Sequence, residues 1–246
     1  MHLSAINVGY RARAARRLLR VAGFLCSTLM FSPSHAADVT GYVVLTTDYV
    51  FRGVTYSDGH AAAQAGADIA LDSGLYFGIW GSTVDVSSSE SRHRDRQLNY
   101  YLGYSHDLRK AWSIGANVVA YTFPATEGDI DYDFLEYSIV TNYDDRIWLE
   151  YSYSPDLFHS SRHSHSLDLY TEWPLIAGLM LGVGAGYYDA SNLTGIGYGY
   201  WQLGLTRSFR RIDVDLRYHD SNRAVPVIST VERAEARIVL SAKLVF

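Results

Sequence analysis

The chain has 246 residues, with 21 lysine and arginine residues, 26 aspartate and glutamate residues and a single cysteine. This acidic balance argues against nucleic acid as a partner, because phosphate binding needs a basic surface. No run of about 18 consecutive apolar residues follows Phe31, so any membrane span has to consist of strands rather than helices.

Residues 1–36 have the features of a secretory signal peptide. Five arginines and no acidic residue come first, followed by a largely apolar stretch from Val21 to Phe31 and by the small-residue sequence Ser34-His35-Ala36. A mitochondrial presequence is also rich in arginine, but it does not usually carry a compact apolar run that ends in a cleavage site. We therefore expect export, with a mature protein that begins at Ala37.

Removal of this leader changes both the charge and the cysteine content. The leader takes five of the 21 basic residues and none of the 26 acidic ones, which leaves 16 against 26 and a net charge of −10. The only cysteine, Cys26, lies in the leader and lacks the small residues that precede a lipoprotein cleavage site. We expect one mature domain of about 210 residues, without a disulfide or a lipid anchor.

Residues 37–246 alternate between apolar and polar with a period of two. In one example, Ile147, Leu149 and Tyr151 alternate with Trp148 and Glu150. Such alternation indicates β-strands that have one apolar and one polar face. We predict strands near residues 39–51, 63–71, 75–84, 97–106, 111–122, 132–142, 146–154, 166–173, 178–188, 198–209, 211–219 and 232–246.

The connections between these strands are alternately short and long. The short ones lie at 72–74, 107–110, 143–145, 174–177 and 210, and the long ones at 58–59, 87–96, 124–131, 155–165, 189–197 and 220–231. Outer-membrane barrels have short periplasmic turns, longer outer loops and an even number of strands. We predict an all-β fold over 37–246, a single antiparallel up-and-down transmembrane β-barrel of about 12 strands in a Gram-negative outer membrane. Ten strands, or a soluble β-sandwich, are the alternatives.

Two features favour lipid around the barrel. Tyrosine occurs 20 times and often falls near predicted strand ends, where an aromatic girdle would lie, as at Tyr42, Tyr49, Tyr76, Tyr104, Tyr121, Tyr187 and Tyr218. The last strand places Ile238, Leu240, Ala242, Leu244 and Phe246 on one face. It resembles the C-terminal strand by which outer-membrane barrels are recognised, so the expected partners are outer-membrane lipid and the barrel insertion machinery.

The first strand carries a family resemblance. Thr40 to Val43, Thr47 to Thr55 and Ser57-Asp58-Gly59 resemble the signature of a proteobacterial outer-membrane family of uncharacterised function, the Gcw_chp family. Weaker similarity extends through 74–82, 101–105 and 132–136, and Thr47 and Thr55 stand where serine is common. The resemblance implies an outer-membrane barrel. It supplies no reaction and no catalytic residues.

If the apolar faces meet lipid, the opposite faces line the interior. The strands at 132–173 then contribute mainly acids, while the last two strands and the first contribute most of the bases. Opposed acidic and basic walls would suit a porin-like channel for small polar or zwitterionic solutes, whereas pairing of the charges across a narrow barrel would plug it. Asp48 and Arg52, four residues apart, are predicted to pair on one strand face. The lumen-lining candidates are Asp48, Arg52, Asp68, Glu136, Glu150, Asp168, Glu172, Arg211, Asp213, Asp215, Arg217, Arg233, Glu235, Arg237 and Lys243.

The alternative functions are a lipid-modifying hydrolase and a structural or adhesive barrel that presents its outer loops. The hydrolase has its best support in the histidine- and serine-rich segment from Phe158 to Ser166, with Asp168 beyond, where a histidine could activate a serine hydroxyl. These residues fall mostly in a predicted loop, and adjacency in sequence is weak support for a triad that the fold must align. The same histidines have poor spacing for a metal. We therefore expect no catalytic residue, no cofactor and no metal site.

Overall fold

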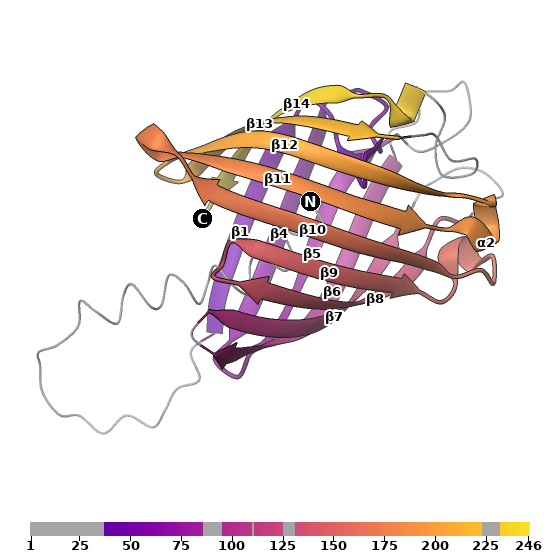
Figure 1. Cartoon of the computed structure of the whole chain (residues 1–246), viewed down its shortest axis with the longest axis horizontal. Coiled ribbons are helices and arrows are strands. Elements are labelled where there is room, and N and C mark those ends of the chain that lie inside the picture. Colours follow the sequence, from indigo (N-terminus) through magenta and orange to yellow (C-terminus); the bar gives the residue numbers. More distant parts are fainter. Residues whose placement is uncertain (1–36, 86–94, 110, 125–130, 223–231) are drawn as a thin grey trace, which may run out of the picture.

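Twelve strands close into an antiparallel barrel in the computed structural model of the chain, which describes residues 37–85, 95–109, 111–124, 131–222 and 232–246 (Figure 1). The strand order around the barrel is β1-β14-β13-β12-β11-β10-β9-β8-β7-β6-β5-β4. Within the described residues, no helix is long and apolar enough to cross a membrane. The predicted signal peptide lies outside the described residues.

The wall strands match the predicted ones closely in position. They are β1 (Ala37–Thr46), β4 (Ala62–Leu71), β5 (Leu75–Val84), β6 (Asp95–Arg109), β7 (Trp112–Thr122), β8 (Phe134–Tyr143), β9 (Ile147–Ser154), β10 (Ser164–Pro174), β11 (Leu179–Asp189), β12 (Gly197–Phe209), β13 (Ile212–Ser221) and β14 (Arg237–Val245). The single turns η1 (Leu157–His159), η2 (Ile176–Gly178), α2 (Ser191–Thr194) and η3 (Glu232–Ala234) lie in the connections. The prediction of an antiparallel barrel of 12 strands is confirmed.

The first and last strands form the seam that closes the barrel. β1 pairs with β14 from Tyr42 opposite Val245 to Thr46 opposite Ser241, and it pairs with β4 on its other side. Gly41 exchanges two backbone hydrogen bonds of 2.9 Å with Phe246. The seam therefore leaves the twelve described wall strands without a free edge, which is the condition for strands to cross a membrane.

The two faces of the wall have opposite polarity. Leu45, Leu102 and Ile139 are 67%, 52% and 55% exposed on the outside. Glu136 and Glu150 are each 1% exposed on the inside. A soluble sandwich would bury the apolar side chains and expose the carboxylates. An apolar exterior instead fits a barrel surrounded by lipid.

The tyrosines need a correction. Tyr104 and Tyr187 are about half exposed on the outer surface, but Tyr42, Tyr76 and Tyr121 point into the barrel, where they are at most 4% exposed. The reason is strand parity, because these three belong to the inward-facing set of their strands. Inward tyrosine rings lie over glycines of the neighbouring strands, as Tyr101 does over Gly78 and Tyr76 over Gly103. Aromatic rings therefore fill part of the barrel interior.

Long and short connections lie at opposite ends of the barrel. The short ones use backbone that turns tightly, such as Asp144 and Asp145 with φ of 55° and 52° between β8 and β9. The first long connection, residues 47–61, contains β2 (Val50–Phe51) and β3 (Val54–Thr55), which form a two-stranded sheet separate from the wall. The predicted strand over 39–51 is therefore wrong beyond Thr46, because the chain leaves the wall there.

Candidate functional site

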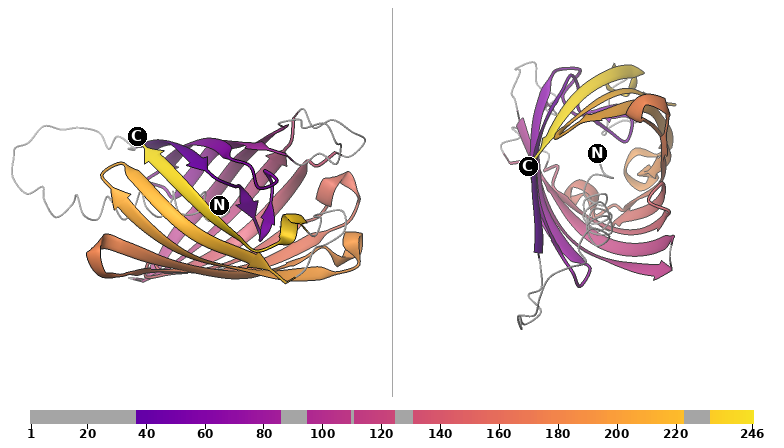
Figure 2. Two further views of the ribbon diagram at one scale, coloured as in Figure 1. Left: turned by 90° about the horizontal axis from the view of Figure 1, so that it is seen from above. Right: turned by 90° about the vertical axis from the view of Figure 1, so that its left-hand side faces the viewer.

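Residues 47–61, here called the hairpin segment, fold into the barrel from the end that carries the long connections (Figure 2). Val50 pairs with Thr55 and Phe51 with Val54, across a turn in which Arg52 and Gly53 have φ of 48° and 77°. Positive φ at both central residues is typical of the two-residue hairpin turn whose twist matches that of the flanking strands. A Cβ on Gly53 would lie 2.6 Å from the Cβ of Tyr200 on β12, so only glycine fits between hairpin and wall.

One side of the hairpin segment packs on aromatic rings of the wall. Tyr49 makes an edge-to-face contact with Trp80 of β5 at 5.5 Å between ring centroids, and Phe51 lies 5.9 Å from Tyr121 of β7. Tyr121 in turn stacks on Phe134 of β8 at 4.4 Å. Together these rings form a buried apolar cluster inside the barrel. The hairpin is therefore fixed by packing as well as by polar contacts.

The tip of the hairpin carries a buried ion pair. The two terminal nitrogens of Arg52 donate to the two carboxylate oxygens of Glu136 on β8, at 2.8 and 3.0 Å, and the side chains are 4% and 2% exposed. The guanidinium also lies 4.9 Å from the ring centroid of Phe51 and 5.0 Å from that of Tyr188. Burial alone would lower the pKa of Arg52, but the Glu136 carboxylate raises it well above its ordinary value, assisted by Tyr200 and Asp168. Arg52 therefore stays charged.

The base of the hairpin is tied by Asp48. One carboxylate oxygen accepts hydrogen bonds from the hydroxyls of Thr55 at 2.5 Å and Ser57 at 2.7 Å, and the other accepts from Arg237 of β14 at 2.8 Å. The predicted pair of Asp48 with Arg52 is therefore wrong. The chain turns between the two residues, so that they bind opposite parts of the wall.

A cavity of about 50 Å³ lies beside the hairpin tip. Its lining includes Arg52, Glu150, Asp168, Tyr200 and His219. Glu150 of β9 and Asp168 of β10 are direct cross-strand partners on the inward face. Asp168 accepts hydrogen bonds from Ser166 at 3.0 Å and from Tyr200. The cavity thus brings two carboxylates together beside the Arg52 guanidinium.

Most of the other predicted interior residues also lie on inward faces of the strands. These are Asp68 on β4, Glu172 on β10, Asp213, Asp215 and Arg217 on β13, and Arg237 and Lys243 on β14. Arg217 donates to Asp215 at 2.9 Å, and the Lys243 nitrogen lies 4.1 Å from the ring centroid of Tyr42.

Three of the predicted interior residues need correction. Arg211 is exposed in the tight turn between β12 and β13, and Glu235 is exposed between η3 and β14. Arg233 lies in η3 at the rim of the barrel. The alternation of the last strand begins only at Arg237, because a helical turn precedes it.

Among the histidine and serine residues considered for a hydrolase, His163 and His165 do not face Ser164 and Ser166. Ser164 and Ser166 are buried inside the barrel, whereas His165 is half-buried on the other face of β10, where its Nδ1 lies 2.6 Å from the Tyr151 hydroxyl. His163 lies beside His165, with 5.1 Å between ring centroids. Successive residues of a strand point to opposite sides. This arrangement gives His163 no hydrogen bond to the Ser164 hydroxyl.

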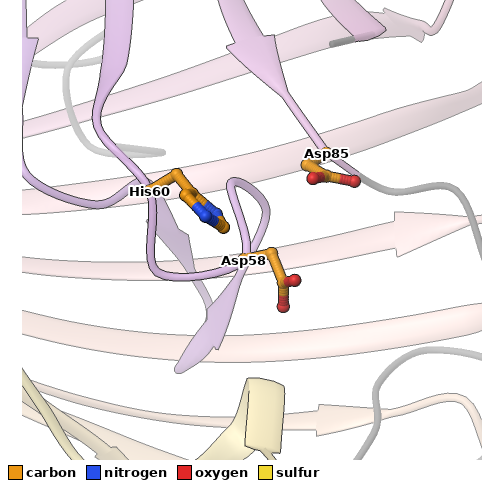
Figure 3. Close-up of side chains that lie close together, drawn as sticks. All are labelled: Asp58, His60 and Asp85. Carbon is orange, nitrogen blue, oxygen red and sulfur yellow. The ribbon is translucent and has the colours of Figure 1, made fainter. Parts of the chain in front are cut away.

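A cluster that the sequence did not reveal lies at the barrel rim. Asp58, His60 and Asp85 each place one candidate ligand atom within 4.8 Å of the others (Figure 3). Arg233 reaches the same place, with its Nε 3.5 Å from an Asp58 carboxylate oxygen and another guanidinium nitrogen donating to the Asp85 backbone oxygen at 2.7 Å. The guanidinium offsets part of the acidic charge, and its contacts link the hairpin segment, the residue after β5 and η3.

A closed antiparallel barrel with an apolar exterior and a charged interior is a transmembrane β-barrel of the outer-membrane type. The chain belongs to the Gcw_chp family, described as a bacterial protein of unknown function, whose model matches residues 31–245. The resemblance noted on the first strand is thus confirmed. Most of the residues that carry that resemblance, Thr47 to Gly59, lie in the hairpin segment.

Solved structures with this fold include porins. The KdgM porin is similar over 86% of this chain and 99% of its own, with a TM-score of 0.52 and 7% identity. The structure of the same porin in complex with disordered oligogalacturonate has a TM-score of 0.50 and 8% identity, over 86% of this chain and 99% of its own. A structure from work on in-meso crystallization of membrane proteins gives 0.53 and 10% identity over 85% of this chain and 83% of its own. These likenesses concern the fold alone. No curated protein matches the sequence significantly.

Proposed function

We propose that the protein is a porin-like channel of the Gram-negative outer membrane, through which small polar solutes diffuse. The reversed polarity of the wall carries the proposal, because carboxylates and guanidinium groups lie inside the barrel while apolar side chains cover its outside. Charged groups inside a protein are costly unless they are paired or hydrated. A polar conduit is the function that makes use of such an interior.

The route for solutes runs beside the hairpin segment. The hairpin contacts Trp80 on one side of the barrel and Tyr200 on the other, so it narrows the cross-section. The wall at β9 and β10 instead presents serine and carboxylate side chains, and the cavity beside the hairpin tip opens on it. An inward-folded loop of this kind limits the size of the solute.

Anionic saccharides are not the expected cargo. The KdgM porin has a structure with an oligogalacturonate, which is an acidic sugar chain. Among the residues that the structure describes, the interior carries more acids than bases, so a polyanion would be repelled. Small neutral, zwitterionic or cationic solutes fit the charge of this interior better.

Export and insertion belong to the same proposal. Residues 1–36 would direct the chain across the inner membrane as a cleaved signal peptide. The strand that ends at Phe246 would be read by the barrel insertion machinery, and outer-membrane lipid would then surround the apolar exterior.

Planar-bilayer recording of the purified protein tests the proposal. We expect stepwise increases of current in simple salt solution. Different gel mobilities of unboiled and boiled samples would show that the barrel is folded. A silent bilayer with such protein would overturn the channel. Lipid hydrolysis by the same silent sample would support the hydrolase instead.

A further inference from the structure

The cluster at the barrel rim combines a histidine with two carboxylates. Asp58 and His60 belong to the hairpin segment, and Asp85 directly follows β5. One candidate ligand atom of each residue lies within 4.8 Å of the others, so an imidazole and two carboxylates come together from two segments of the chain (Figure 3). Across the described part of the chain, no other three residues of these types gather in this way.

Backbone hydrogen bonds hold the two segments in place. The Asp85 amide donates to the Tyr56 backbone oxygen at 2.6 Å, which ties the end of β5 to the hairpin segment. The turn from Ser57 to His60 is closed by the His60 amide, which donates to the Ser57 backbone oxygen at 2.9 Å, and by the Ser57 hydroxyl, which donates to the His60 backbone oxygen at 2.7 Å. The three side chains therefore extend from backbone that is positioned before any ion binds.

The His60 ring has the hydrogen bond that is typical of a metal ligand. Its Nδ1 lies 3.2 Å from the Ser57 backbone oxygen. A carbonyl oxygen only accepts, so this contact is favourable when Nδ1 carries the ring proton, which leaves the lone pair of Nε2 for a metal ion. Metal-binding histidines almost always donate the other ring N–H to a carbonyl, a carboxylate or water.

Arg233 competes with an ion for only one of these ligands. Its Nε lies 3.5 Å from a carboxylate oxygen of Asp58, whereas its 2.7 Å hydrogen bond to Asp85 goes to the backbone oxygen. The Asp58 side chain is 45% exposed in this long contact, and exposed ion pairs are weak. The Asp58 carboxylate can therefore turn from the guanidinium to a divalent ion.

We propose that Asp58, His60 and Asp85 bind one divalent transition-metal ion, of the class that Zn²⁺ represents. Zinc takes imidazole nitrogen and carboxylate oxygen in the same site, whereas Ca²⁺ and Mg²⁺ take oxygen ligands. Bonds of about 2.0–2.2 Å keep two zinc ligands no more than about 4.4 Å apart. The cluster therefore contracts slightly when the ion binds, which the exposed side chains of Asp58 and His60 permit. The bound ion joins the hairpin segment to the end of β5.

Zinc titration of the folded barrel in detergent tests the proposal. The protein carries no histidine tag and has Cys26→Ser, so that no thiol binds the ion. Calorimetry should show a zinc equivalent that His60→Ala abolishes and whose affinity Asp85→Asn lowers at least tenfold. Arg233→Gln should raise the affinity several-fold, because it removes the guanidinium from Asp58. Calcium should not compete for the site.

His159→Ala is the matched control. His159 is an exposed histidine whose Nε2 lies 3.5 Å from Asp131 and whose Nδ1 lies 3.8 Å from Asp156. These two carboxylates lie at different ring nitrogens rather than around one ion, so this variant should bind zinc as its parent does.

The outcomes decide on the site independently of any current through the barrel. Equal zinc stoichiometry and affinity in the parent and in His60→Ala would overturn the proposal. An equal loss in His159→Ala would overturn it as well, because zinc would then bind at exposed histidines in general. If His60→Ala does not fold, Asp85→Asn and the opposite effect of Arg233→Gln still decide. A silent bilayer would contradict the channel and leave the metal site intact.

Discussion

Removal of the Arg52 guanidinium should release the hairpin segment from the barrel interior. Its partner Glu136 would then be a buried carboxylate without its bidentate donor, and the loss of one partner from a buried pair costs about 3–5 kcal/mol. The pair is almost fully buried, at 4% and 2% exposure, so solvent screening does not reduce this value much. Since every 1.4 kcal/mol is about tenfold, the released fraction should rise roughly a hundred-fold to several thousand-fold.

Thiol labelling can measure this release. Val54 is 1% exposed in the hairpin, and Cys26 is the only native cysteine. In a Cys26→Ser background, Val54→Cys should therefore react with a thiol reagent only when the hairpin opens, at a rate that reports the open fraction. Arg52→Ala and Glu136→Gln should each accelerate labelling.

Two comparisons make the test decisive. The double variant Arg52→Met/Glu136→Met should label more slowly than Arg52→Ala, because it does not leave Glu136 as a buried carboxylate without its donor. Arg146→Ala should not change the rate, because it breaks an ion pair whose side chains are 46% and 55% exposed. Equal labelling rates in the wild type and in Arg52→Ala, with both barrels folded, would refute the role of the buried pair.

Three further substitutions test other parts of the structure. Asp48→Asn removes the ion pair with Arg237 and should weaken hairpin docking by about 1–3 kcal/mol, visible as faster labelling at the same cysteine; an unchanged rate would argue against the tie at the hairpin base. Gly53→Ala places a Cβ 2.6 Å from the wall at a residue with φ of 77°, so single-channel recordings should show larger current steps; steps of wild-type size would contradict the close fit. Gly78→Ala puts a Cβ 2.6 Å from a backbone oxygen of the adjacent strand and should cost about 1–3 kcal/mol of barrel stability. The folded band on a gel should then disappear at a lower heating temperature. Gly199→Ala, whose Cβ would have no atom nearer than 3.6 Å, should not change that temperature.

The wall of the barrel could be predicted from the sequence because membrane strands obey a simple rule. The side-chain period is two, the outside must be apolar, and the turns alternate in length. Parity alone therefore predicts that Glu150, Asp168 and Lys243 face the interior, and the structure places them on inward faces. The same parity puts the Tyr42 side chain inside the barrel, whereas an aromatic girdle would need it on the outer surface.

The hairpin segment could not be predicted in this way. Asp48, Val50 and Arg52 continue the alternation of β1, so a period of two gives no sign that the chain leaves the wall after Thr46. What decides its position is a set of distant contacts, such as that of Arg52 with Glu136, which are 84 residues apart. The turn at Arg52 and Gly53, both with positive φ, is marked in the sequence only by the dipeptide Arg-Gly.

The size of the current step with and without the hairpin tests the central claim most directly. A variant in which residues 49–56 are replaced by a short glycine-serine link keeps all twelve wall strands and removes β2 and β3. We predict that this variant, folded and inserted in a planar bilayer, conducts several-fold more current per step than the wild type. Equal step sizes would contradict the conclusion that the inward-folded hairpin narrows the barrel.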